Sequence, residues 1–345
     1  MGDVRRLIRG RRERVLSRCD HGFTALHYAV LRGHAGAARV LIEEGRAPLD
    51  VEDEEGNAPL NVAADRGHLE VLRLLVTRGA AVDKPNRDGK TALVMAAEMG
   101  HVAVVRVLVG AGASLNARDI YGKTILHHAA ERGQTSMVRM LLLETIVAMV
   151  VDVADAKGHT ALHIAAWYDD CAEIAALLLE EGLATIDPRG GDTDATPLIL
   201  AADKGYQAVV RVLLEHGAVV NAKTVDSCTA LHFAAQEGHF ETVRALLDYG
   251  ARFDALSDRG YTPVDLAAKY SRMDVLQLLL RSGAMVVLAM NKLGLRIERQ
   301  VFLEDEVIFS ETPLPAQILG THRRPCPHDD EDVKEEELSS RLRDV

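Results

Sequence analysis

The sequence predicts an all-α solenoid of eight stacked helix-turn-helix units joined by β-hairpin-like turns. Three observations predict this fold: a short motif recurs at nearly constant spacing, an alanine follows every copy at one fixed distance, and the apolar residues behind each copy recur at three and four positions. A single pair of short helices cannot bury enough surface to be stable, so units of this kind depend on their neighbours.

The recurring motif reads Thr-Ala-Leu-His in three copies and Thr-Pro-Leu in a fourth, and the other four copies are close variants of it. The eight copies begin at Thr24, Ala58, Thr91, Thr124, Thr160, Thr196, Thr229 and Thr262, with spacings of 34, 33, 33, 36, 36, 33 and 33 residues. An alanine stands five residues after each start, from Ala29 in the first copy to Ala267 in the last. Eight copies in register exclude chance similarity.

Motif and period resemble the ankyrin repeat, whose signature is Thr-Pro-Leu-His-x-Ala and whose length is about 33 residues. The resemblance covers roughly residues 19–290. It implies a non-catalytic fold in which partners contact the tips of the turns and the exposed side of the first helix of each repeat, on the concave face.

Each element of the repeat has a local reason. The Thr that opens the motif is a good N-cap, and the prolines Pro59, Pro197 and Pro263 fall at the first helical position, where a missing N–H costs nothing. A glycine then ends the short first helix in most repeats, as a left-handed C-terminal position prefers. The second helix, as in residues 68–75, has one apolar face and ends at a Gly-Ala pair in most repeats.

Charge and regularity divide the chain into three parts: a basic N-terminal helix or cap at 1–18, eight repeats at 19–290, and a C-terminal extension at 291–345 that we expect to be disordered from about residue 311. Residues 1–18 carry seven Arg against Asp3 and Glu13, a sum of +5. Residues 329–345 carry eight acids against three bases, a sum of −5, so the body keeps the whole net charge of −11. An acidic body argues against nucleic acid as a partner.

The remaining bulk features predict an intracellular, monomeric protein of the cytoplasm or nucleus, with no membrane partner. The four cysteines are far apart and form no C-x-x-C, which favours a reducing compartment. The N-terminus lacks an apolar stretch of signal-peptide length, and the most apolar run, at 140–151, is too short to span a bilayer.

No motif predicts an enzyme or a cofactor site, and a weak H-x3-C-x-H spacing at His322, Cys326 and His328 in the tail is better explained as a polar tail than as a metal site. The Gly-Lys-Thr runs at 89–91 and 122–124 lack the earlier glycine of a phosphate-binding loop. Most of the fourteen histidines occupy fixed repeat positions, such as His27, His127, His163 and His232. Because these positions lie one repeat apart, they predict a ladder of local hydrogen bonds instead of a metal cluster.

Two positions per repeat are the candidate partner contacts under the resemblance. The first is the residue just before each motif: Phe23, Asn57, Lys90, Lys123, His159, Ala195, Cys228 and Tyr261. The second is the pair that ends each first helix, of which Trp167-Tyr168 stands out, because Trp and Tyr bury much area with few rotors. An alternative for Trp167 is packing against a neighbouring repeat, which would compensate for Asp169-Asp170 replacing Gly-His.

The two 36-residue spacings flank the repeat that contains Trp167. Extra residues fall near 144–155 and in the turn 188–194, which contains Arg189 and Asp192. Since insertions map to loops that often face the ligand, we expect repeats four to six to form the main contact surface. Similarity to ankyrin-repeat substrates of asparaginyl hydroxylation also makes Asn116 and Asn221 candidate modification sites.

Two functional hypotheses follow. The first is a non-catalytic scaffold or adaptor that binds a protein on its concave face. The second is a regulatory protein recruited to nucleic acid or an anionic membrane by its basic N-terminal helix. Salt-sensitive binding to DNA or anionic lipid that is abolished by deleting residues 1–18 would favour the second.

Overall fold

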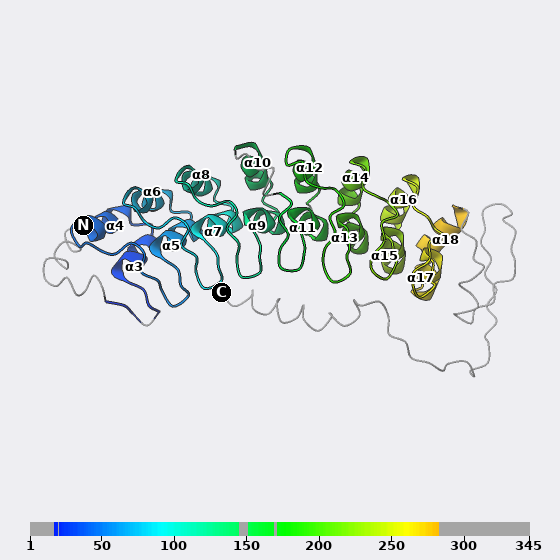
Figure 1. Cartoon of the computed structure of the whole chain (residues 1–345), viewed down its shortest axis with the longest axis horizontal. Helices are drawn as coiled ribbons and strands as arrows, with labels where there is room; N and C mark the ends of the chain where they lie inside the picture. The colour runs from blue at the N-terminus through cyan, green and yellow to red at the C-terminus, as the bar shows by residue number, and fades with distance from the viewer. Residues whose placement is uncertain (1–16, 20, 145–150, 169–170, 283–345) are drawn as a thin grey trace, which may run out of the picture. The chain divides into compact units, whose positions relative to one another are not determined.

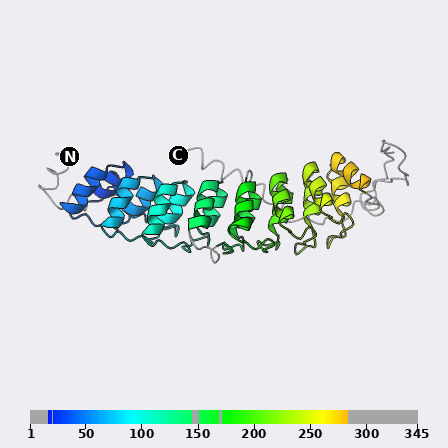
Figure 2. The ribbon, with the colours of Figure 1, turned by 90° about the horizontal axis from the view of Figure 1, so that it is seen from above.

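The computed structural model describes residues 17–19, 21–144, 151–168 and 171–282. These residues contain sixteen helices, α3 to α18, which form eight consecutive pairs. The first helices of the pairs stand in one row and the second helices in a row beside it, as Figure 1 shows. Figure 2, turned by 90°, shows the pairs following one another side by side.

The first helices are short and begin directly after the motif start. They are α3 (Ala25–Leu31), α5 (Pro59–Asp65), α7 (Ala92–Glu98), α9 (Ile125–Glu131), α11 (Ala161–Trp167), α13 (Pro197–Lys204), α15 (Ala230–Glu237) and α17 (Pro263–Lys269). The second helices are α4 (Ala35–Glu43), α6 (Leu69–Thr77), α8 (Val102–Gly110), α10 (Thr135–Glu144), α12 (Ala172–Glu180), α14 (Gln207–Glu215), α16 (Phe240–Asp248) and α18 (Met273–Arg281).

The core lies between the two rows and between successive pairs. Each first helix packs against its own second helix, and from α3 to α15 each also packs against the first helix of the next repeat. The alanines of the first helices make this approach possible: Ala63, Ala64, Ala96 and Ala97 are fully buried, because only a methyl group separates the neighbouring backbones. Leucines and valines of the second helices, such as Leu72 and Leu75, fill the remaining space.

A first ladder of buried imidazoles joins the repeats. In the repeat that begins at Thr160, the backbone N–H of Thr160 donates to His163 Nδ1 at 3.0 Å, so His163 Nε2 carries the proton and donates to the carbonyl of Ala195 at 3.1 Å. The equivalent link is made by His27, His127 and His232, each of which accepts from its own N-cap Thr and donates to the carbonyl of Asn57, His159 or Tyr261 in the next repeat. The predicted histidine ladder is therefore confirmed in these four repeats.

A second ladder starts at the residue after the helix-ending glycine. His68, His101 and His239 donate from Nε2 to the carbonyls of Leu31, Asp65 and Asp203 in the preceding repeat, at 3.2, 2.9 and 2.9 Å. Gly67 shows why glycine is needed beside this ladder. Its φ is +68°, and a Cβ there would lie 2.7 Å from His101 Cε1.

The turns between repeats are joined at their tips by backbone hydrogen bonds. Ile120 N donates to Asp88 O at 2.9 Å, Ala156 N to Tyr121 O at 2.8 Å and Gly191 N to Lys157 O at 2.8 Å. Across the described ranges, β pairing is limited to one isolated bridge between Gly190 and Ala195. The turns thus stack beside the first helices as hairpin-like loops without forming a sheet, and the all-α solenoid is confirmed.

Several expectations fall on residues outside the described ranges. The basic helix or cap at 1–18 lies there except for its last two residues, as do the extension from 291 and its disorder from about 311. The chain divides into two units, Met1–Ala289 and Met290–Val345, and the second lies wholly outside the described residues. Within the described residues, no helix is long and apolar enough to cross a membrane.

Candidate protein-binding surface

The residues that directly precede the motif copies differ in how deeply they are buried. Phe23, Lys90, Lys123, His159 and Tyr261 are half-buried. Asn57, Ala195 and Cys228 are buried at 6%, 2% and 3% exposure, so the expectation that they face a partner is wrong. The Asn57 side chain is held within its own turn by Asp53 Oδ2 at 3.2 Å, and Ala195 is drawn in by the bridge to Gly190.

Lys90 is part of a charged cluster that joins repeats three and four. Its Nζ lies 2.7 Å from Glu98 Oε2, and Arg132 of the next repeat donates to Glu98 Oε1 at 2.8 Å. Burial opposes ionisation of Glu98, but the hydrogen bonds from Arg132 and Lys90 outweigh it and lower the pKa of this carboxyl to about 2. The cluster is therefore charged and ordered at neutral pH.

Lys123 repeats this arrangement one repeat further on. Its Nζ lies 2.6 Å from Glu131 Oε2, while the Tyr168 hydroxyl of repeat five donates to Glu131 Oε1 at 3.1 Å. Partial burial, together with the Glu131 carboxylate, raises the pKa of Tyr168 to about 12. Tyr168 keeps its proton and is 37% exposed.

Trp167, the last residue of α11 in repeat five, extends these contacts to repeat six. It is half-buried, packs on the core, and has the Lys204 Nζ over its ring at 4.1 Å from the centroid. The packing interpretation of Trp167 is thus supported, because a side chain of the next repeat covers one face of the indole. Lys123, Glu131, Tyr168, Trp167 and Lys204 form a chain of contacts across repeats four to six, which we call the central surface.

The turn 188–194 lies at the edge of repeat six. Arg189 is exposed and donates to Lys223 O at 2.6 Å and to Asp194 Oδ2 at 3.3 Å, while Asp192 is exposed. Arg189 therefore ties this turn to repeat seven. His159 packs against the same turn, since a Cβ on Gly191 would lie 2.8 Å from His159 Nε2.

Two predicted contacts lie far from the central surface. Phe23 in repeat one stacks on His27 with 5.5 Å between ring centroids. Tyr261 in repeat eight has Lys269 Nζ 5.3 Å from its ring centroid. The structure therefore gathers the central candidates and leaves these two at opposite ends of the array.

Sequence reasoning overlooked an apolar turn beside the central surface. Ile120 and Tyr121, at the tip of the turn that enters repeat four, are 59% and 61% exposed. They precede Lys123 by three and two residues, respectively, and so border its ion pair with Glu131. The signal was present in the sequence, because an Ile-Tyr pair is unusual in a turn of otherwise polar residues.

The two candidate hydroxylation sites differ in their surroundings. Asn116 is exposed, whereas the Asn221 amide donates to Gly250 O at 3.2 Å and accepts from Arg252 N at 2.8 Å. Hydroxylation of either residue stays a prediction. Peptide mass spectrometry of protein from its native host tests it, and we expect Asn116, whose surroundings are more open, to be the better substrate.

Three curated relatives share parts of the sequence. A segment of 82 residues is 40% identical to the B-cell lymphoma 3 protein homolog of Mus musculus, covering 24% of this chain and 18% of that protein. A segment of 72 residues is 42% identical to the BTB/POZ domain and ankyrin repeat-containing protein BOP of Lupinus luteus, covering 21% and 14%. A segment of 75 residues is 32% identical to poly [ADP-ribose] polymerase tankyrase of Caenorhabditis elegans, covering 21% and 3%. The chain thus matches less than a fifth of the length of each relative.

A family model described as ankyrin repeats (3 copies) matches the chain in overlapping segments. The matched residues are 2–86, 46–119, 79–150, 112–190, 145–224 and 220–289. Together these segments cover every repeat seen in the described residues. The family is in general non-catalytic and binds proteins.

Proposed function

The chain belongs to the ankyrin-repeat family, and from this premise we propose that it is a monomeric, non-catalytic scaffold or adaptor that binds a protein partner through its central surface. The proposed contacts are Trp167 and Tyr168 at the centre, with Lys123, His159 and the turn containing Arg189 and Asp192 around them. Lys90, Phe23 and Tyr261 extend the same face toward the two ends. We place this activity inside the cell, in the cytoplasm or nucleus.

The observation that carries the proposal is the chain of contacts that fixes the central surface across three repeats. Tyr168 is bound to Glu131 of the preceding repeat, and Trp167 is covered by Lys204 of the following one. Side chains ordered in the free protein lose less conformational entropy on binding. Exposed Tyr and Trp area that is already ordered therefore favours tight and selective contact with a protein.

Affinity purification tests the proposal with the full chain as bait. The double variant Trp167→Ala/Tyr168→Ala removes the aromatic centre, and we expect proteins captured by the wild type to be lost from it. Tyr249→Ala is the matched control, because Tyr249 is an exposed tyrosine that follows the second helix of repeat seven. It should capture the same proteins as the wild type.

The helical circular dichroism of each variant must match that of the wild type for the comparison to count. Since the central surface combines apolar area with mutually paired charges, capture should persist when salt is raised, unlike binding driven by unpaired basic residues. Retention of the wild-type partners by the folded double variant would refute the central surface as the binding site.

A further inference from the structure

The second helices carry an arginine at the same position in six of the eight repeats. These are Arg39, Arg73, Arg106, Arg139, Arg211 and Arg244, and all six are exposed. They stand in the row of second helices, away from the turns that border the central surface (Figure 1). The second helices also carry acidic residues, and two of these, Glu173 and Glu241, pair with Arg139 and Arg244.

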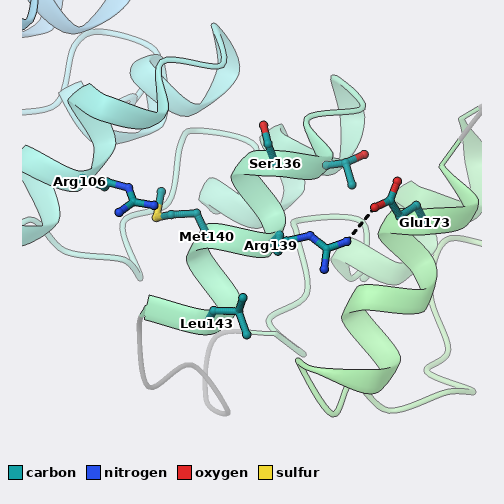
Figure 3. A pocket seen from close by; sticks show the side chains of 7 residues that line it. Arg106, Ser136, Arg139, Met140, Leu143 and Glu173 are labelled. Atoms are coloured by element: carbon teal, nitrogen blue, oxygen red, sulfur yellow. Dashed lines mark hydrogen bonds and ion pairs between the residues drawn. The ribbon is translucent and has the colours of Figure 1, made fainter.

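One part of this row is hollowed into a pocket of about 420 Å³. It lies among α8, α10 and α12 and is lined by Arg106, Thr135, Ser136, Arg139, Met140, Leu143 and Glu173. Figure 3 shows Arg106 reaching from α8 toward Met140, and Arg139 reaching from α10 to Glu173. The pocket thus presents two guanidinium groups beside an apolar wall, in which Leu143 is 60% exposed.

The charge around the pocket favours an anionic occupant. The pocket is lined by two arginines and one glutamate, so its charged side chains sum to +1. Glu173 pairs with Arg139 at 2.8 Å, but the two side chains are 61% and 49% exposed. Exposed ion pairs contribute little to stability, so a ligand carboxylate can replace Glu173 at Arg139 without a large loss.

The apolar wall narrows the class of ligand. A free phosphate would gain nothing from Leu143, and nucleic acid needs a basic surface longer than two arginines with an acid beside them. We propose that this pocket binds an acidic peptide segment of a second protein, with carboxylates at Arg106 and Arg139 and an apolar side chain against Leu143. It would be an interaction site separate from the central surface.

Fluorescence anisotropy with a labelled peptide of repeating Glu-Glu-Leu tests the proposal on the full chain. The wild type is expected to bind it and to bind the Gln-Gln-Leu and Glu-Glu-Ser counterparts much more weakly. Arg139→Gln should weaken binding about fivefold, whereas Glu173→Gln, which removes a competing carboxylate, should tighten it about threefold. Arg211→Gln is the matched control, with the same position in repeat six outside the pocket, and should change affinity less than about twofold.

Leu143→Ser separates the apolar contact from the charge. It should weaken binding of Glu-Glu-Leu and leave that of Glu-Glu-Ser unchanged.

No binding by the wild type, equal binding of Gln-Gln-Leu, or equal weakening by Arg139→Gln and Arg211→Gln would each overturn the proposal. Duplex DNA that binds more tightly than the peptide and loses affinity in Arg139→Gln would replace it with a nucleic-acid site. Trp167→Ala/Tyr168→Ala should bind the peptide as the wild type does, which keeps this test independent of the central surface.

Discussion

The interface between repeats five and six and the interface between six and seven are built on different chemistry at the same position. In the first, His163 links its own N-cap, Thr160, to Ala195 in the next repeat. In the second, the equivalent residue is Ile199, which is buried and carries no polar atom. As a result the Thr196 hydroxyl is buried without a hydrogen-bond partner among the described residues, whereas the Thr160 hydroxyl lies 3.1 Å from His163 Nδ1.

The difference shows that repeats of the same fold can be joined to their neighbours by different contacts. Val94 stands at the corresponding place between repeats three and four, so apolar links lie on both sides of the block formed by repeats four to six. Inside that block His127 and His163 supply directional hydrogen bonds. The central surface is carried by the same block, and hydrogen bonds that fix the register of its repeats also fix the spacing of Tyr168, Trp167 and Lys204.

Of the changes that test this comparison, acidification is expected to have the largest effect on the free energy of unfolding. Burial lowers the pKa of His163 and of His232 to about 4, against 6.5 for an exposed imidazole. Between these values the unfolded chain takes up protons that the folded chain does not, so the free energy of unfolding falls as the pH drops from 6.5 toward 4 and is unaffected by these groups above 6.5. At about pH 5 the loss is about 2 kcal/mol for each histidine. Urea unfolding near pH 7.5 and near pH 5 measures it, and equal midpoints would contradict it.

His163→Ile makes the interface between repeats five and six resemble the one between six and seven. The apolar side chain fills much of the volume, but it leaves the Thr160 N–H without its acceptor and removes a donor from the Ala195 carbonyl. We expect a loss of about 2 kcal/mol in the free energy of unfolding near pH 7.5, the cost of an unsatisfied buried donor. The free energy of unfolding of the variant should also fall less between pH 7.5 and pH 5, because His163 no longer takes up a proton on unfolding.

His216→Ile is the control for that substitution. His216 is an exposed imidazole after α14; its Nδ1 donates to the carbonyl of Val212 at 2.7 Å, and its Nε2 lies at the surface 3.4 Å from Glu180 Oε1 of the preceding repeat. Its replacement should change the urea midpoint little. Equal losses in the two variants would mean that the buried ladder does not stabilise the interface between repeats more than a surface contact does.

Ile199→His is the reciprocal change and is expected to stabilise the chain by about 1 kcal/mol near pH 8. The imidazole would give the Thr196 hydroxyl a partner and bring a donor toward the carbonyl of Cys228. Ile199→Val, which removes one methylene without adding polarity, should instead destabilise by about 1 kcal/mol. Destabilisation by Ile199→His at that pH would show that the apolar fit of this interface outweighs the missing hydrogen bonds.

The repeats could be read from the sequence because their signals are local. A Thr N-cap, a proline at the first turn and a glycine at the end act within a few residues, so each motif copy places its first helix directly. The contacts of the candidate residues could not be read in this way. The pairing of Lys90 with Glu98, and the burial of Ala195, depend on how each turn folds against the next repeat.

The smallest expected effect concerns the contact that ends the central surface. Lys204→Gln removes the cation over the Trp167 ring and should lower stability by about 0.5 kcal/mol. Because Trp167 is the only tryptophan, its fluorescence reports the contact directly, and acrylamide should quench it more strongly in the variant. Lys269→Gln, which removes a similar contact over Tyr261 and Tyr270, is the control and should leave tryptophan quenching unchanged. If Lys204→Gln also leaves quenching unchanged, Lys204 does not cover the indole in solution, and Trp167 is then open to a partner without any rearrangement of repeat six.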